Sequence, residues 1–171
     1  MTRSIVSQAH DFYDAVPYEV PVPDTSLYEL LDTAARLYPD RVALDYFGAT
    51  TTYAQVRDQV LRAARVLHEA GVRAGDTVAI SLPNCPQAFV AFYACMRIGA
   101  VAAQHNPLAP AQEIAGQLAR HGGRVAVVWE KCVDAYPLDA LDTVLTVDIS
   151  FSMPASQRFL LKLPVPRARQ M

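Results

Sequence analysis

Three polar side chains stand together at residues 104–106, where the apolar run of RIGAVAAQHNPLAPAQE (97–113) ends. Gln104, His105 and Asn106 are followed by Pro107, so the cluster sits at a change of element. An imidazole titrates near neutral pH and can serve as a general base when a partner carboxylate assists it. No carboxylate adjoins His105 in the sequence, so we do not expect it to be catalytic.

Two interpretations of His105 and Asn106 stay open. In the structural one, Asn106 begins a turn and bonds nearby backbone, while His105 satisfies a buried carbonyl at a strand end. In the functional one, His105 and Asn106 are substrate-binding residues that form part of the wall of a channel. Neither interpretation gives them a part in the chemistry itself.

The sequence contains none of the motifs that carry the commonest reactions. It has no HExxH and no Cys/His cluster, so we expect no metal ligands. GxxxxGK[ST] is absent, and the turn LPNCP (82–86) brings proline where a dinucleotide site needs glycine. No GxSxG surrounds a serine. We therefore assign no catalytic, cofactor-binding or metal-binding residue.

The three cysteines, Cys85, Cys95 and Cys132, form no CxxC pair. This pattern favours small buried side chains in a reducing compartment over a disulfide framework. A nucleophilic Cys85 in a strand-to-helix turn is the weaker alternative.

The composition is that of one soluble globular domain. Of the 171 residues, 52% are hydrophobic, which is enough for a sizeable core. The net charge of −2 shows no basic excess, so we expect no nucleic-acid partner. The N-terminus lacks an apolar signal region, and the longest apolar run, 88–103, falls short of the roughly 20 residues of a spanning helix. We expect a cytoplasmic protein.

The first part of the chain is predicted to form a helix, a hairpin and a second helix. Ser26 and Glu29 make a capping box before apolar residues spaced by three and four, and Pro39 closes that helix. A strand at 42–47 turns at Gly48 and returns at 50–53. The most regular helical pattern spans 53–70.

From residue 77 the pattern changes to alternating units. Continuously apolar strands are predicted at 77–82, 100–104, 124–129 and 143–148. Helices are predicted at 83–99, which is apolar almost all round and should be buried on both sides, and at 110–122. Such strands separated by helices indicate a parallel sheet. The fold class is α/β, a doubly wound and mostly parallel sheet flanked by helices.

The predicted organisation has three parts. An extended arm covers residues 1–23, the α/β subdomain covers 24–150, and a basic and apolar tail or linker covers 151–171. In open α/β sheets, ligands bind beyond the carboxyl ends of the strands. That rule selects four turns, LPNCP, QHNPLAP, WEKC and DISFS.

Two segments carry a family resemblance. TTYAQV (51–56) and AGVRAGDTVAISLPNCPQAFVAFYACMRIGAVAAQHNPLAPAQEI (70–114) resemble the N-terminal region of AMP-forming acyl-CoA ligases, and most of all the bacterial long-chain fatty-acid–CoA ligases. The segment at 153–169 is similar to the linker of actinobacterial-type members. NPLAP lacks a tyrosine and a threonine often present there. The resemblance covers about residues 24–169 and implies an N-terminal subdomain of an adenylate-forming enzyme.

The resemblance implies a two-step reaction. ATP and a fatty acid give an acyl-adenylate and pyrophosphate, and CoA then displaces AMP. The phosphate loop, the metal and ribose contacts and the late lysine of this family all come after the region that matches Met171. We therefore expect an inactive fragment that binds no cofactor itself, with ATP, Mg and CoA used by the complete enzyme.

Partner expectations follow from the same resemblance. The alternative to a ligase fragment is a non-catalytic binding module that assembles with a separate chain carrying the missing half. Exposed apolar surface would also favour self-association. In the tail, Arg158, Lys162, Arg167 and Arg169 flank Phe159, Leu160, Leu161 and Leu163. This mixture either contacts the inner membrane face peripherally or docks on the rest of the enzyme.

Overall fold

The computed structural model describes residues 24–162. The predicted arm at 1–23 and the last part of the tail, 163–171, lie outside the described residues. No helix within 24–162 combines the length and apolarity needed to cross a bilayer.

The first elements form as the local signals predict. Helix α2 (Leu27–Leu37) begins at the expected capping box, in which the Glu29 N–H donates to Ser26 Oγ at 3.3 Å. Strands β1 (Val42–Tyr46) and β2 (Ala49–Thr52) pair antiparallel as the predicted hairpin. Helix α3 (Tyr53–Glu69) begins at a second capping box, made by Thr52 and Gln55.

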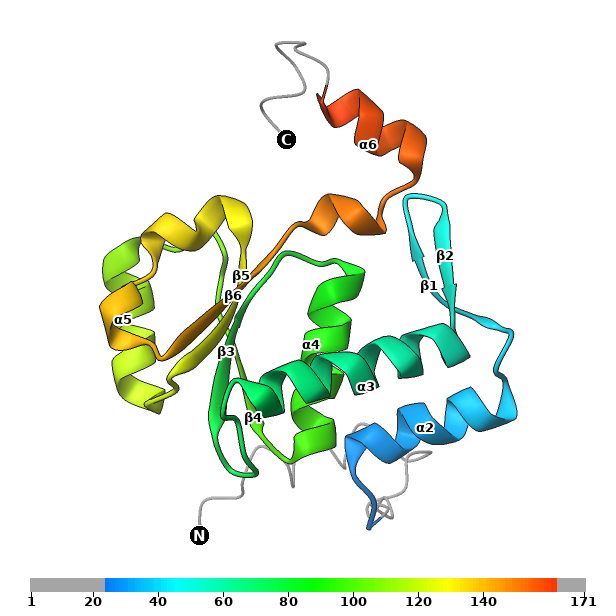
Figure 1. The fold of residues 1–171 in the computed structure, drawn as a ribbon, viewed down its shortest axis with the longest axis horizontal. Coiled ribbons are helices and arrows are strands. Elements are labelled where there is room, and N and C mark those ends of the chain that lie inside the picture. The colour runs from blue at the N-terminus through cyan, green and yellow to red at the C-terminus, as the bar shows by residue number, and fades with distance from the viewer. Residues whose placement is uncertain (1–23, 163–171) are drawn as a thin grey trace, which may run out of the picture.

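The main sheet is parallel, as the apolar strands predicted. Its strands are β3 (Thr77–Ser81), β4 (Val101–Gln104), β5 (Val125–Trp129) and β6 (Thr143–Val147). Among the described residues they lie in the order β4-β3-β5-β6 (Figure 1). Ile80 pairs with both Gln104 and Val127, so β3, β4 and β5 end at the same edge.

Helices cover both faces of this sheet, which confirms the doubly wound prediction. Helix α4 (Pro86–Ile98) and α3 lie on one face, and α5 (Ala111–His121) lies on the other (Figure 1). Alternate residues of each strand serve the two cores: Val78 and Ile80 face α3 and α4, whereas Ala79 faces α5. This two-sided burial explains why the strands are apolar throughout.

Helix α4 packs against two cores, as its nearly uniform apolarity predicted. Its small residues Ala91, Ala94 and Cys95 are buried against the sheet. Its aromatic residues Phe89 and Tyr93 pack against the core between α2 and α3. Gly99 ends the helix with φ 82°, the left-handed conformation expected of a C-terminal glycine.

One connection had no predicted element, and one detail differs from the sequence prediction. The β5–β6 connection contains the short 3-10 turns η2 (Glu130–Ala135) and η3 (Leu138–Ala140). Pro137 lies between them and cannot donate the N–H that a continuous helix needs there. Helix α5 also begins at Ala111, so Pro110 is its N-cap and not its first residue.

The described part of the tail is helical. A 3-10 turn, η4 (Ile149–Ser152), leads from β6 to α6 (Ala155–Lys162). Gln157 Nε2 donates to the carbonyl of Phe47 at 3.3 Å and so links α6 to the β1–β2 hairpin. Phe159, Leu160 and Leu161 are exposed. Contact of this segment with a membrane stays a prediction.

Candidate functional site

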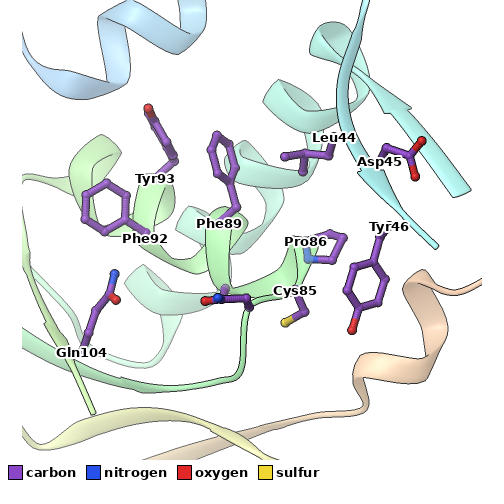
Figure 2. A pocket seen from close by; sticks show the side chains of 11 residues that line it. Leu44, Asp45, Tyr46, Cys85, Pro86, Phe89, Phe92, Tyr93 and Gln104 are labelled. Atoms are coloured by element: carbon purple, nitrogen blue, oxygen red, sulfur yellow. The ribbon is translucent and has the colours of Figure 1, made fainter. Parts of the chain in front are cut away.

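An open hollow of about 490 Å³ lies at the carboxyl edge of the sheet, between α4 and strand β1 (Figure 2). Two of the four turns selected from the sequence contribute to it, through Asn84 and Cys85 after β3 and Gln104 at the end of β4. We call it the aromatic hollow; its lining residues are Leu44, Asp45, Tyr46, Asn84, Cys85, Pro86, Ala88, Phe89, Phe92, Tyr93 and Gln104.

Three aromatic side chains of α4 form one wall. Phe89, Phe92 and Tyr93 are spaced by three and four residues, so they share a helix face. The ring centroids of Phe89 and Tyr93 lie 4.6 Å apart, and those of Phe92 and Tyr93 lie 5.5 Å apart. Gln104 supplies a polar group at one side, whereas the Asp45 carboxylate points away from the aromatic rings and accepts the Gly48 N–H at 2.9 Å (Figure 2). Apolar walls with a few polar groups suit a ligand with a substantial apolar part.

Cys85 does not have the properties of a nucleophile. Its side chain is buried beside the N-terminus of α4, and burial raises the pKa of its thiol. The backbone N–H groups of Ala88 and Gln87 act in the opposite direction, but burial is the larger cause. A thiol with a raised pKa is protonated at neutral pH and reacts poorly. The second core cysteine, Cys95, has its pKa raised by burial to about 11.

The polar cluster of residues 104–106 is divided between different environments. Gln104 lines the aromatic hollow, whereas His105 and Asn106 are not among its lining residues. Asn106 is exposed, and its Oδ1 accepts the Leu108 N–H at 3.0 Å, which confirms the expected turn. His105 is 6% exposed and contacts Tyr136 and His121 on the α5 side of the sheet. A channel-wall role for either residue stays a prediction.

Sequence reasoning missed two parts of this arrangement. Leu44, Asp45 and Tyr46 of β1 close one side of the hollow, although the hairpin is distant from α4 in sequence. The ring partners of His105 were also missed, and His105 bonds side chains and not the expected carbonyl. The aromatic spacing in α4 was the available signal for the hollow. Within residues 24–162, no three His, Cys, Asp or Glu side chains gather closely enough to hold a metal ion.

Comparison with known proteins identifies the family. A family model described as AMP-binding enzyme matches residues 31–162. The chain belongs to this family. The chain is 28% identical to a long-chain-fatty-acid–CoA ligase of Bacillus subtilis (strain 168) over 159 residues, which are 90% of this chain and 28% of that one. It is also 45% identical to an acetyl-coenzyme A synthetase of Emericella nidulans over 80 residues, 43% of this chain and 12% of the other.

The fold of the chain also matches solved structures. The N-terminal subdomain of NpsA from Klebsiella oxytoca superposes with a TM-score of 0.64 at 30% identity, covering 70% of this chain and 30% of that chain. The α/β architecture is therefore that of an N-terminal subdomain of an adenylate-forming enzyme. The chain spans less than a third of the length of each of these three proteins.

Proposed function

We propose that this chain is the N-terminal part of a long-chain fatty-acid–CoA ligase. The complete enzyme would convert ATP, a fatty acid and CoA into acyl-CoA, AMP and pyrophosphate. The likeness to the Bacillus subtilis ligase supports this choice because it runs along 90% of the chain. The likeness to the acetyl-coenzyme A synthetase is higher in identity but is confined to 43% of the chain.

The aromatic hollow is the observation that carries the proposal of an apolar substrate. Phe89, Phe92 and Tyr93 present ring faces and edges at the carboxyl edge of the sheet. We infer that this wall borders the path of the fatty acyl chain. A long acyl chain gains about 0.8 kcal/mol for each methylene it buries, so an aromatic wall discriminates it from acetate.

The residues described here do not fit ATP or Mg²⁺. The turn after β3 places Pro83 and Pro86 where a phosphate site needs backbone N–H groups. No described carboxylate cluster offers the oxygen ligands that Mg²⁺ prefers. We therefore assign ATP, Mg²⁺ and CoA to parts of the enzyme outside this chain, and we propose that the isolated chain is inactive.

A chimera tests the substrate class. Residues 31–162 would replace the matching segment of the Bacillus subtilis ligase, and acyl-CoA would be measured with palmitate and with acetate. We expect turnover of palmitate, and Phe92→Ala should lower its kcat/KM by about 10- to 30-fold, because an aromatic truncation costs roughly 1.4–2 kcal/mol of acyl contact.

Two controls accompany the chimera. Phe151→Ala should leave kcat/KM unchanged, because Phe151 is 66% exposed and lies outside the hollow. The 171-residue chain alone should form no AMP from ATP, palmitate and CoA. Faster turnover of acetate than of palmitate by the chimera, or AMP formation by the chain alone, would contradict the proposal.

A second candidate is a binding module that assembles with a separate chain. The observation in its favour is a groove of about 560 Å³ beside β6, which is an edge strand of the described sheet. Apolar side chains line it from four elements, including Val66 of α3, Val90 of α4 and Leu145 of β6. An edge strand next to apolar surface is suited to continuation of the sheet by another segment.

Co-elution tests this second candidate. The chain would be mixed with the complementary segment of the Bacillus subtilis ligase and analysed by size-exclusion chromatography. We expect a 1:1 complex that Val66→Arg weakens at least about tenfold, since a charge at a buried apolar contact costs more than 1.4 kcal/mol. Leu61→Arg, on the same helix but outside the groove, is the matched control. Failure of the unsubstituted segments to co-elute would reject the assembly.

A further inference from the structure

Two histidines and a tyrosine join three segments on the α5 face of the sheet. His105 follows β4, His121 is the last residue of α5, and Tyr136 follows η2. His105 Nε2 lies 3.0 Å from His121 Nε2, and His105 Nδ1 lies 3.1 Å from the Tyr136 hydroxyl. We call these three residues the histidine clasp. Sequence separations of 16 and 31 residues make it a tertiary contact.

A backbone group fixes the position of each proton in the clasp. The Gly123 N–H donates to His121 Nδ1 at 3.0 Å, so this nitrogen must be an unprotonated acceptor. The proton of neutral His121 is then on Nε2 and is donated to His105 Nε2. His105 in turn carries its proton on Nδ1 and donates it to Tyr136. The hydrogen bonds therefore run in one direction.

Ser81 lies beside the Tyr136 end of the clasp. Its Oγ is fully buried at the end of β3 and makes no hydrogen bond among the described residues. It nevertheless lies close enough to the Tyr136 hydroxyl to lower the pKa of that group, against the larger opposite effect of burial. Because Tyr136 accepts from His105, its own O–H proton is free to point toward Ser81.

The same geometry has no place for a third proton. A proton on His121 Nδ1 would face the Gly123 N–H, and a proton on His105 Nε2 would face the N–H of His121. In either case two donors meet at about 3 Å in a partly buried site, and the hydrogen bond between them is lost. The hydrogen bonds of the clasp therefore require both rings to be neutral.

The surroundings of the clasp also disfavour charge. Burial lowers the pKa of His105, and the neighbouring His121 lowers it further. Burial is likewise the main cause that lowers the pKa of His121; a hydrogen bond with its own backbone acts in the opposite direction, and Arg120 of α5 lowers the pKa further. The other titratable group nearby is Cys132 of η2, which acts on Tyr136. The ion pairs of the described residues join arginines to aspartates, and none includes a clasp histidine.

We propose that the histidine clasp is a pH-sensitive switch, which holds β4, α5 and the segment after η2 together when both rings are neutral and releases them when either is protonated. The segment 105–110 between β4 and α5 is the part that this release would affect first. Gln104 immediately precedes it and lines the aromatic hollow, so acidification would alter one side of that hollow.

Imidazole NMR of the full 171-residue chain tests the proton positions directly. At pH 7.5, long-range ¹H–¹⁵N spectra should show His121 as the Nε2–H tautomer and His105 as the Nδ1–H tautomer. Either ring in the other tautomer, or charged at that pH, would overturn the proposal. This measurement needs no variant and does not depend on enzymatic activity.

Unfolding by urea between pH 8 and pH 5 tests the energetic coupling. In the unfolded chain, histidines take up protons near their ordinary pKa of about 6.5. In the folded chain, the pKa values of His105 and His121 are lower. The unfolded state thus binds more protons, so stability is complete above about pH 6.5 and falls as the pH drops below it. The unfolding equilibrium constant should rise by up to about tenfold per pH unit for each clasp histidine.

Variants identify the groups responsible. His105→Gln and His121→Gln should each flatten this pH dependence, and the double variant should flatten it most. His68→Gln, at an exposed histidine of α3, should leave the slope unchanged. A wild-type slope in both clasp variants would reject the switch, and if a variant fails to fold, the wild-type NMR result decides. Amide exchange corrected for its intrinsic pH dependence should increase in α5 more than in α3 at pH 5.5, and equal increases would show that nothing is released.

Discussion

Replacing Ile114 with alanine is expected to lower the free energy of unfolding by about 2–5 kcal/mol. Ile114 is 0% exposed and is the largest of the fully buried side chains. It projects from α5 onto the sheet, where Ala79, Ala126 and Val128 present their side chains. Alanine would leave a cavity there that the backbone of a parallel sheet cannot close, so both the lost burial and the cavity contribute.

Urea unfolding at pH 7.5 measures this effect above the range in which the clasp histidines titrate. Leu108→Ala is the matched control, because Leu108 lies just before α5 and is 77% exposed. It should change the free energy of unfolding by no more than about 0.5 kcal/mol. If Ile114→Ala also cost less than about 1 kcal/mol, α5 would not be packed on the sheet as described.

Local patterns along the chain predicted most of the fold because each helix and strand carries its own signal. The spacing of apolar residues at 53–70 corresponds to α3 within one residue. Strands β3 and β5 carry apolar side chains on both faces, because neighbouring residues such as Val78 and Ala79 each meet a different helical layer. The residue pattern of these strands therefore indicates burial on both faces of the sheet.

Contacts between segments distant in the sequence could not be predicted from local patterns. His105 was correctly placed at a strand end, but nothing near it in the sequence indicates Tyr136 or His121 as partners. The sequence spacing shows that Phe89, Phe92 and Tyr93 share one face of α4. It does not show whether this face is covered by another element or lines a pocket, because that depends on where β1 packs. No element was predicted for the β5–β6 connection, in which Pro137 separates two short 3-10 turns.

The structure gives separate roles to the three polar residues at positions 104–106. Gln104 faces the hollow, Asn106 makes a turn, and His105 belongs to a buried hydrogen-bond chain on the opposite face of the sheet. Three adjacent residues thus serve three different purposes. The alternation of side chains along a strand and its continuation accounts for the division between Gln104 and His105.

Gly123→Ala is expected to destabilise the protein by about 2–4 kcal/mol, the sum of overpacking and a lost buried hydrogen bond. A β-carbon at this position would lie 2.6 Å from the carbonyl oxygen of Thr77 and 3.0 Å from Cε1 and Nδ1 of His121. The Thr77 oxygen belongs to the backbone of β3, so it cannot move without shifting the sheet. The His121 ring would also be pushed aside, and it would lose the Gly123 N–H that fixes its tautomer.

A second glycine makes the comparison decisive, because the same substitution should have the opposite effect on stability seven residues earlier, at Gly116. Gly116 lies within α5 and has open space around the position of a β-carbon. Gly116→Ala should therefore stabilise the protein by about 0.5–1 kcal/mol through helix propensity alone. Urea unfolding of both variants at pH 7.5 measures the difference, and imidazole NMR should show a changed His121 signal only for Gly123→Ala. Equal stability of the two variants, with an unchanged His121 signal in both, would mean that Gly123 is not what holds His121 in the clasp.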